Sequence, residues 1–319
     1  MKILFTSVGR RVELMQAFKS AARELKIDLT IIGADITESA PALYFCDETR
    51  IVCRIKDENY IPQLLKICEE DQVDCLIPTI DTDLLLLAEN KKRFETIGTK
   101  VLISAADKVK LCRDKRFTAD YFISLGLKSP QPVDDVEKYN MGYPAFIKPK
   151  DGSSSIDAYK VANEEDLRIY ANRIADYIIQ PFISGREFTI DIFCDYEGNP
   201  VYITPRERLA VRAGEVLKTQ ICQDDVMNSE MKTLIKDYKP CGQITVQLIQ
   251  DEVTGDNYYI EINPRFGGGA PLSIKAGADS AKAVLRMLCG ETLIYEENAA
   301  RDKAIYSRFD QSICVYEGI

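Results

Sequence analysis

Gln247, Glu261 and Asn263 bring oxygen donor atoms to a predicted β-hairpin within residues 243–269, QITVQLIQDEVTGDNYYIEINPRFGGG. Side chains alternate between the two faces of a strand, so we expect Glu261 and Asn263 to share a face with Tyr259 and to meet Gln247 on the neighbouring strand. Carboxylate and amide oxygens suit Mg²⁺, which completes its coordination with water and phosphate oxygens. The hairpin therefore predicts a magnesium site, and an ordinary hairpin with solvated polar tips is the alternative.

The other face of this hairpin is predicted to be mostly apolar, and the residues assigned to it are Ile244, Val246, Leu248, Tyr258, Ile260 and Ile262. A polar turn at 251–257 joins the two strands. Arg265 and the glycines at 267–269 follow, ahead of a helix that we expect to begin near Ser273. Backbone N–H groups beside a cation favour anions, so this region predicts phosphate binding next to the metal.

The amino-acid composition limits the kinds of catalysis that this protein can perform. The 319 residues contain no histidine, which removes the usual general base and the commonest transition-metal ligand. Any catalysis must then depend on metal ions, Arg, Lys and carboxylates. Phosphoryl transfer suits these groups because it depends mainly on positioning and charge neutralisation. The net charge of −9 and a pI near 4.9 oppose a general affinity for nucleic acid or anionic membranes, so phosphate binding must be local.

The ten cysteines form no CxxC pair, which makes zinc and disulfide frameworks improbable. Cys75, Cys194 and Cys289 lie in apolar runs and are expected to be reduced core thiols, as in a cytoplasmic protein. No apolar run approaches the length of a membrane span, and Met1 leads into a strand rather than a signal peptide.

Strands and helices alternate over the first hundred residues, which predicts a parallel sheet covered on both faces. The expected strands are 2–8, 29–35, 74–79 and 101–104, and the expected helices are 12–25 and 82–94. The loop Thr6–Arg11 has one glycine where a dinucleotide fingerprint needs three, so an oxidoreductase is a weak alternative. Arg10 and Arg11 either bind a carboxylate or phosphate there or simply start a solvated helix. Further along, helices are expected at 107–125 and 276–289, and a strand at 306–316.

The hairpin with Arg265 resembles the metal-binding end of the ATP-grasp superfamily, and its Gln, Glu, Asn and Arg are most similar to one synthetase unit of the carbamoyl-phosphate synthase large subunit. The resemblance implies an α/β fold: an N-terminal Rossmann-like parallel-sheet domain at 1–106, followed by a two-lobed α+β ATP-grasp domain at 107–319. The small lid lobe of that domain would span approximately 117–182. In relatives the first domain helps to form the pocket of the second substrate.

Matching motif positions imply further site residues. Lys115 stands where the family keeps a phosphate-contacting base, although a surface lysine within RDKR is an equal alternative. Lys148 closes the apolar strand YPAFIKP and would neutralise the α and β phosphates. The loop that follows would cover those phosphates with its backbone amides, and its residues are Gly152, Ser153, Ser154 and Ser155.

Adenine recognition is implied for the strand YIIQPF and its end, where the matching residues are Gln180, Pro181, Phe182 and Ile183. Glu187 would accept hydrogen bonds from the ribose hydroxyls, with an exposed glutamate at a strand start as the alternative. Arg206 and Arg208 share one side of an extended segment, where they bind the γ-phosphate or a carboxylate, or lie as surface charges on an edge strand.

The resemblance implies a carboxylate–amine ligase that converts ATP to ADP and phosphate through an acyl phosphate. Arg265 and Arg208 would be catalytic, and ATP with Mg²⁺, or Mn²⁺ in its place, would be the cofactors. The expected partners are small-molecule carboxylates and amines, with neither nucleic acid nor membrane, and a homodimer is one option. The competing interpretation is an ATP-binding sensor or pseudoenzyme of the same fold that no longer turns over.

Overall fold

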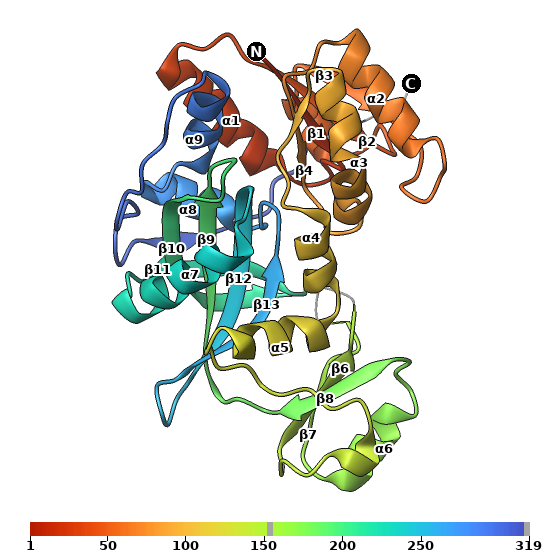
Figure 1. Cartoon of the computed structure of the whole chain (residues 1–319), viewed down its shortest axis with the longest axis vertical. Coiled ribbons are helices and arrows are strands. Elements are labelled where there is room, and N and C mark those ends of the chain that lie inside the picture. Colours follow the sequence, from red (N-terminus) through yellow and green to blue (C-terminus); the bar gives the residue numbers. More distant parts are fainter. Residues whose placement is uncertain (152–155, 316–319) are drawn as a thin grey trace.

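The computed structural model describes residues 1–151 and 156–315, and it arranges them around three β-sheets (Figure 1). A parallel sheet comes first along the chain, a small antiparallel sheet lies at the opposite end of the molecule, and a larger antiparallel sheet lies between them. The predicted α/β class is therefore confirmed, and so is the parallel character of the first sheet.

The parallel sheet has the strand order β3-β2-β1-β4-β5. Its strands are β1 (Lys2–Thr6), β2 (Thr30–Asp35), β3 (Glu48–Ile51), β4 (Cys75–Pro78) and β5 (Lys100–Val101). Successive residues of β1 enter opposite cores: Phe5 packs towards α1 (Val12–Leu25), and Leu4 packs towards α2 (Tyr60–Glu70) and α3 (Leu84–Thr96). Strand β3 and helix α2 are additions to the predicted elements.

The small sheet, with the order β7-β6-β8, has a hydrophobic core of its own. It consists of β6 (Ala145–Pro149), β7 (Tyr159–Val161) and β8 (Tyr177–Pro181), with α6 (Glu164–Ala171) beside it. Leu167 of α6 packs against Ala145, Ile147 and Ile179 of the sheet. Because its core is separate from those of the other sheets, this lobe is held to them mainly through its connecting segments.

The large sheet has the order β13-β12-β9-β10-β11-β14 and supplies more of the wall of the cavity described below than either of the other sheets. Its strands are β9 (Gly185–Cys194), β10 (Pro200–Arg212), β11 (Glu215–Ile221), β12 (Gly242–Asp251), β13 (Asn257–Asn263) and β14 (Ile305–Ser307). Helix α7 (Asp225–Tyr238) buries Met231 and Leu234 against the face that carries Ile190 and Ile244.

Helices α8 (Ala270–Ala276) and α9 (Ser280–Leu288) join the large sheet to the parallel sheet. Helix α9 lies beside α1 (Figure 1), and the ring of Phe18 packs edge-on to Phe266 with 6.0 Å between ring centroids. A continuous hydrophobic core therefore holds the parallel sheet against the end of the hairpin formed by β12 and β13.

The helix predicted at 107–125 is wrong as a single helix. The structure has α4 (Ala106–Arg113) and α5 (Lys115–Ser124) instead. Asp114 separates them because it adopts an extended backbone and its carboxylate accepts a hydrogen bond from the backbone N–H of Arg116, which caps α5. The break places Lys115 in the first turn of α5, where its backbone N–H donates to the carbonyl of Lys150.

Four smaller predictions are also wrong. The helix expected near Ser273 begins at Ala270, and the helix expected at 276–289 is interrupted by Gly277, whose φ is +126°. The strand expected at 306–316 is limited to β14 in the described residues. Cys289, assigned to the core, is exposed at the end of α9, whereas Cys75 and Cys194 are buried as predicted.

Candidate active site

A cavity of about 530 Å³ lies where the three sheets meet, and its wall is rich in charge. Arg11 and Asp81 reach it from loops of the parallel sheet, Lys148 from the small lobe, and Glu261 from the large sheet. The volume lies within the range of small-molecule sites, and the mixture of cations and carboxylates suits a ligand with several phosphate or carboxylate groups.

The predicted oxygen donors of the hairpin meet in this cavity. Gln247 of β12 pairs directly with Glu261 of β13, and Thr245 pairs with Asn263. The Asn263 amide donates a 3.0 Å hydrogen bond to the Glu261 carboxylate. Cross-strand neighbours of this kind have side chains close enough to act on one ion.

These residues fit a magnesium ion only in the presence of a phosphate ligand. Among the described residues, no group of three or more His, Cys, Asp or Glu side chains is arranged to hold a metal. One carboxylate and two amide oxygens leave most of the coordination of Mg²⁺ to water and phosphate oxygens, which is how Mg²⁺ is held in many nucleotide sites. The donor set therefore fits Mg²⁺ that arrives with a nucleotide.

One part of the hairpin prediction is wrong, because a β-bulge interrupts β13. Gln247 pairs with Glu261, but Leu248 pairs with Tyr259, so Ile260 has no partner opposite it. Tyr259 consequently turns into the core, where its hydroxyl donates to Glu230, and Ile260 lines the cavity. The bulge leaves Glu261 and Asn263 facing the cavity while it reverses the faces assigned to Tyr259 and Ile260.

Two lysines carry positive charge to the cavity from elements outside the hairpin, Lys115 from α5 and Lys148 from β6. Lys148 is only 8% exposed, and its pKa is lowered to about 8 by burial and then by the charge of Lys115, against the opposing effect of Glu261. Burial also lowers the pKa of Lys115, and Glu261 opposes this shift. Both lysines therefore lie close enough to the Glu261 carboxylate to interact with it electrostatically.

Arg206 is a buried cation rather than the surface charge offered as an alternative. Its Nε donates a 2.7 Å hydrogen bond to Asp191, which also accepts from Thr245 and Ser273. Among the described residues, the buried Nη1 of Arg206 has no hydrogen-bond partner although the side chain lines the cavity. A buried unpaired N–H is costly, so this atom favours an anionic ligand. Gly269 leaves room for this guanidinium, because a Cβ added there would lie 2.5 Å from Nη2 of Arg206.

Arg208 is held at the cavity wall by three neighbours. Its Nε approaches Glu187 at 3.3 Å, Nη1 donates to Thr189, and Nη2 donates to the carbonyl of Gly214. Burial lowers the pKa of this guanidinium, and Glu187 opposes the shift. Glu187 also lines the cavity, so the structure brings both predicted residues together.

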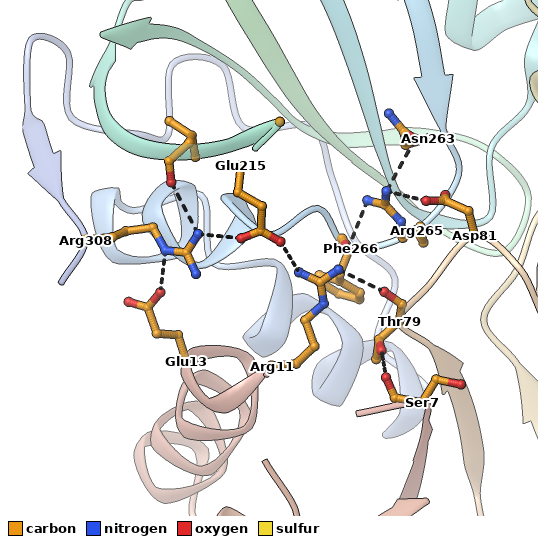
Figure 2. Close-up of polar contacts among 12 residues, drawn as sticks. Ser7, Arg11, Glu13, Thr79, Asp81, Glu215, Asn263, Arg265, Phe266 and Arg308 are labelled. Atoms are coloured by element: carbon orange, nitrogen blue, oxygen red, sulfur yellow. Dashed lines mark hydrogen bonds and ion pairs between the residues drawn. The ribbon is translucent and has the colours of Figure 1, made fainter. Parts of the chain in front are cut away.

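Arg265 joins the hairpin to the parallel sheet. Its Nη2 donates to Asp81 at 2.6 Å and to Asn263 at 3.3 Å (Figure 2). The Nε atom of Arg265 is buried without a hydrogen-bond partner in the described part of the chain. Arg265 is therefore positioned beside the donor set with hydrogen-bonding capacity left for an anion.

Arg11 also enters the cavity, whereas Arg10 does not. Hydrogen bonds to two carboxylates hold the loop before Arg11 in place. Thr6 and Ser7 donate to the buried carboxylate of Asp83, and the backbone N–H of Gly9 donates to Asp35. The Arg11 guanidinium donates to the carbonyl of Thr79 and lies between that residue and Glu215 (Figure 2). Arg10 is instead an exposed side chain near Asp310.

The residues predicted to bind adenine do not line the cavity. Gln180 is buried and donates to the carbonyl of Pro130, and Phe182 contacts Phe146, which does line the cavity. Pro181 and Ile183 are likewise absent from the wall, so an adenine role for this strand end stays a prediction. Gly152, Ser153, Ser154 and Ser155 lie outside the described residues.

Sequence reasoning missed Asp81, Asp191 and Glu215. Asp81 follows β4, and ligand-binding residues of parallel sheets lie just beyond the carboxyl ends of the strands, so its position was a usable signal. The other two give no comparable signal, because Asp191 lies inside an apolar strand and Glu215 follows a turn that reads as surface. Their roles depend on contacts between residues distant in sequence.

The parallel sheet, the lobe with a phosphate-type lysine and the hairpin donor set define an enzyme that binds a nucleotide with Mg²⁺ between two lobes. Residues 3–102 match the family described as PylC-like, N-terminal domain, and residues 112–269 match the ATP-grasp domain. The chain belongs to the ATP-grasp superfamily, as its hairpin predicted.

Related proteins support this family membership. Carbamoyl-phosphate synthase of Methanobrevibacter smithii is 26% identical over 311 residues, which cover 91% of this chain and 81% of the relative. D-alanine–D-alanine ligase B of Clostridium perfringens is 25% identical over 210 residues, covering 56% of this chain and 69% of the relative.

Among solved structures, the biotin carboxylase domain of 2-oxoglutarate carboxylase from Hydrogenobacter thermophilus, in complex with MgADP, ADP and bicarbonate, has a TM-score of 0.74 at 19% identity, covering 95% of this chain and 73% of the other. This structural likeness shows the fold. The sequence family and its ligase members confirm the prediction of an ATP-dependent, ADP-forming carboxylate–amine ligase with ATP and Mg²⁺ as cofactors.

Proposed function

We propose that this cavity activates a small carboxylate as an acyl phosphate and passes it to an amine, with the residues named above in specific roles. The observation that carries the proposal is the joining, in one cavity, of the donor set Gln247, Glu261 and Asn263 with cations from all three sheets. Phosphoryl transfer requires this combination of in-line positioning and charge neutralisation.

Each group of residues has a defined task. Lys115 and Lys148 bind the polyphosphate, and Glu187 orients the ribose. Gln247, Glu261 and Asn263 hold Mg²⁺, which when bound neutralises charge on the phosphate oxygens. Arg265 and Arg208 stabilise the charge that spreads over the transferred phosphoryl group, because both present guanidinium groups to the cavity.

Arg206 has a further role that its burial supports. Arg206 lines the cavity wall, and its buried Nη1 atom has no hydrogen-bond partner among the described residues; this atom gains one when a phosphate or acyl phosphate oxygen binds. Asp191 keeps the rest of this guanidinium fixed, so Arg206 acts as a pre-oriented cation rather than a mobile one.

The remaining assignments extend the proposal to the whole molecule. We divide the chain at residues 106 and 107 into a sheet domain and an ATP-grasp domain, with the lid at approximately 117–182. In the described part of the chain, none of the helices is both long and apolar enough to cross a bilayer. The related biotin carboxylase domain forms a dimer, and we extend a homodimer and a cytoplasmic location to this protein as proposals.

The test is a product analysis with hydroxylamine as the amine. With Mg·ATP and a panel of small carboxylates and bicarbonate, the protein should release ADP and form a hydroxamate with one class of carboxylate. Hydroxylamine traps acyl phosphates, so both products arise from one intermediate. AMP and pyrophosphate in place of ADP would contradict attack at the γ-phosphate.

A thermal scan provides an independent check of nucleotide binding. Mg·ATP should raise the melting temperature, and NAD(P) should leave it unchanged, because only a ligand that favours the folded state stabilises it. The opposite pattern would return the parallel sheet to the dinucleotide interpretation.

A further inference from the structure

A pair of opposite charges lies at the end of the cavity formed by the parallel sheet. Nη1 of Arg11 and Oε1 of Glu215 are 3.8 Å apart, which is too far for a hydrogen bond. Both side chains line the cavity, and Glu215 is half exposed to it and to solvent. The pair is therefore open, with hydrogen-bonding capacity left on both partners (Figure 2).

We propose that Arg11 and Glu215 form the subsite of a carboxylate substrate that carries an ammonium group next to its carboxylate, as an α-amino acid does. Arg11, together with Arg265, receives the carboxylate, and Glu215 receives the ammonium group. This inference rests on the proposed function and names the substrate class of its carboxylate.

Space for such a ligand is kept by Gly268. A Cβ added to Gly268 would lie 3.0 Å from Nη1 of Arg11 and 3.2 Å from Oε2 of Glu215, so even a methyl group would fill the volume between the two charges and the loop. The backbone of Gly268 has no positive φ that would demand glycine. The glycine is thus explained by the space it leaves beside both charged groups.

Arg308 is the positioning residue of this subsite. It donates to Oε2 of Glu215 at 3.0 Å, to the carbonyl of Val216 and to Glu13 of α1 (Figure 2). Partial burial favours the neutral carboxyl of Glu215, but the hydrogen bond from Arg308 and the charge of Arg11 outweigh it and lower its pKa. Glu215 therefore remains ionised and binds a cation instead of accepting a proton.

The two ends of the cavity are electrostatically distinct. At the phosphate end, burial lowers the pKa of Lys148 and of Lys115, and Glu261 opposes both shifts. The pKa of Arg11, by contrast, is lowered by burial and then by Arg265, and raised by Glu215 and Asp81. Arg11 and Arg265 thus lie close together between the metal donors and Glu215. A carboxylate bound by both arginines is beside the phosphoryl donor, and the cation it carries faces Glu215.

A purely structural role makes a different prediction. If the network of Glu13, Arg308, Glu215 and Arg11 only clamped the parallel sheet to β11, the loss of charge at Glu215 would lower stability and leave substrate affinity unchanged. If Glu215 binds the ammonium group, the same change raises the KM of the amino acid and leaves kcat and ATP affinity unchanged.

The experiment compares each amino acid with the same acid lacking the amino group. Glycine is paired with acetate, L- and D-alanine with propanoate, L-glutamate with glutarate, and L-phenylalanine with 3-phenylpropanoate, with bicarbonate as a separate probe. ADP release is measured with Mg·ATP and hydroxylamine. In at least one pair, we expect the amino acid to be preferred about tenfold or more in kcat/KM, the size of a charged hydrogen bond.

Three variants test whether the preference for an amino acid depends on the subsite of Arg11 and Glu215. Glu215→Gln should raise the KM of the preferred amino acid about tenfold or more, with kcat and the Kd of ATP unchanged. Gly268→Ala should weaken the binding of both the amino acid and its deamino counterpart, because the added methyl group fills space that both ligands occupy. Asp310→Asn is the matched control, since it removes a nearby negative charge that pairs with Arg10 and Arg212 outside the cavity.

The outcomes separate the inference from the proposed function. Turnover of bicarbonate or of deamino acids alone would overturn the inference and leave the ligase intact. A Glu215→Gln protein with a lower melting temperature and unchanged KM would also overturn it, in favour of the clamp. ATP binding without ADP release on every probe would count against the proposed function and the inference together.

Discussion

Arg265, two residues beyond the end of β13, donates a 2.6 Å hydrogen bond to Asp81, which follows β4 of the parallel sheet. The same Nη2 atom reaches Asn263 at 3.3 Å (Figure 2). The parallel sheet therefore sets the direction of a guanidinium that lies beside Asn263 of the hairpin. A change in the first sheet should then alter chemistry in the large one.

Asp81→Asn should lower kcat about tenfold to hundredfold and change the Kd of ATP by less than about threefold. The amide keeps the shape of the carboxylate but loses the charge that orients Arg265, and small displacements of a catalytic group have effects of this size. ADP release and nucleotide titration measure the two quantities. The double variant Asp81→Asn/Arg265→Lys should be no slower than Arg265→Lys alone, and additive losses would show that Asp81 acts independently of Arg265.

Glu261→Gln should reduce turnover about 10²-fold or more while leaving measurable ATP binding. Glu261 supplies the one carboxylate of the donor set, and the proposed polyphosphate ligands Lys115 and Lys148 lie on other elements. Glu252→Gln, an exposed residue in the turn of the same hairpin, is the matched control. Near-wild-type turnover by Glu261→Gln would remove the metal role from the hairpin.

Asp191→Asn should lower the melting temperature by roughly 6–10 °C. The change leaves the buried Arg206 guanidinium without its countercharge, which costs about 3–5 kcal/mol of the free energy of unfolding, at roughly 2 °C per kcal/mol for a chain of this size. Calorimetry measures the shift, with the exposed Asp28→Asn as control. Mg·ATP should raise the melting temperature of the variant more than that of the wild type, because phosphate replaces the lost charge. An equal shift in both proteins would contradict phosphate contact at Arg206.

The sequence predicted the donor set because face alternation holds where Gln247, Glu261 and Asn263 are read as neighbours. The same alternation gave the wrong face for Tyr259, two residues before Glu261. A bulge inserts Ile260 there without any glycine or proline to mark it. The local break at Asp114 was readable in principle, since aspartate favours the N-cap of a helix. Backbone signals of this kind are local.

The remaining site residues are set by contacts that no local pattern encodes. Arg206 and Arg208 read equally well as surface charges, and only the packing of β9 beside β10 brings Asp191 and Thr189 to them. Glu215 lies 204 positions from Arg11 in the chain, and the two approach because α1 packs on α8 and α9. Tertiary contacts of this range assemble the proposed substrate end of the cavity, whereas the residues of the proposed nucleotide end lie in sequence motifs.

Lys148 gives the cavity a pH dependence of known sign. Its pKa is lowered to about 8 by burial and by Lys115, so the free protein loses this charge as pH rises through about 8. Bound polyphosphate stabilises the ammonium form and raises that pKa, and binding is therefore accompanied by proton uptake above pH 8. The Kd of ATP should increase between pH 8 and pH 9.5 by up to about tenfold per pH unit, and it should be nearly constant between pH 6.5 and pH 7.5.

Two variants test this assignment by calorimetric titration of Mg·ATP across the same pH range. Lys148→Ala should bind ATP more weakly at pH 7 and lose the dependence above pH 8. Lys148→Arg should also lose the dependence, because a guanidinium stays charged throughout, and it should bind more tightly than Lys148→Ala. Lys138→Ala is the control on the same lobe, since that lysine is exposed, pairs with Asp135 and does not lie on the cavity wall. A pH profile that persists in Lys148→Ala would assign the titration to another group and leave Lys148 without a phosphate role.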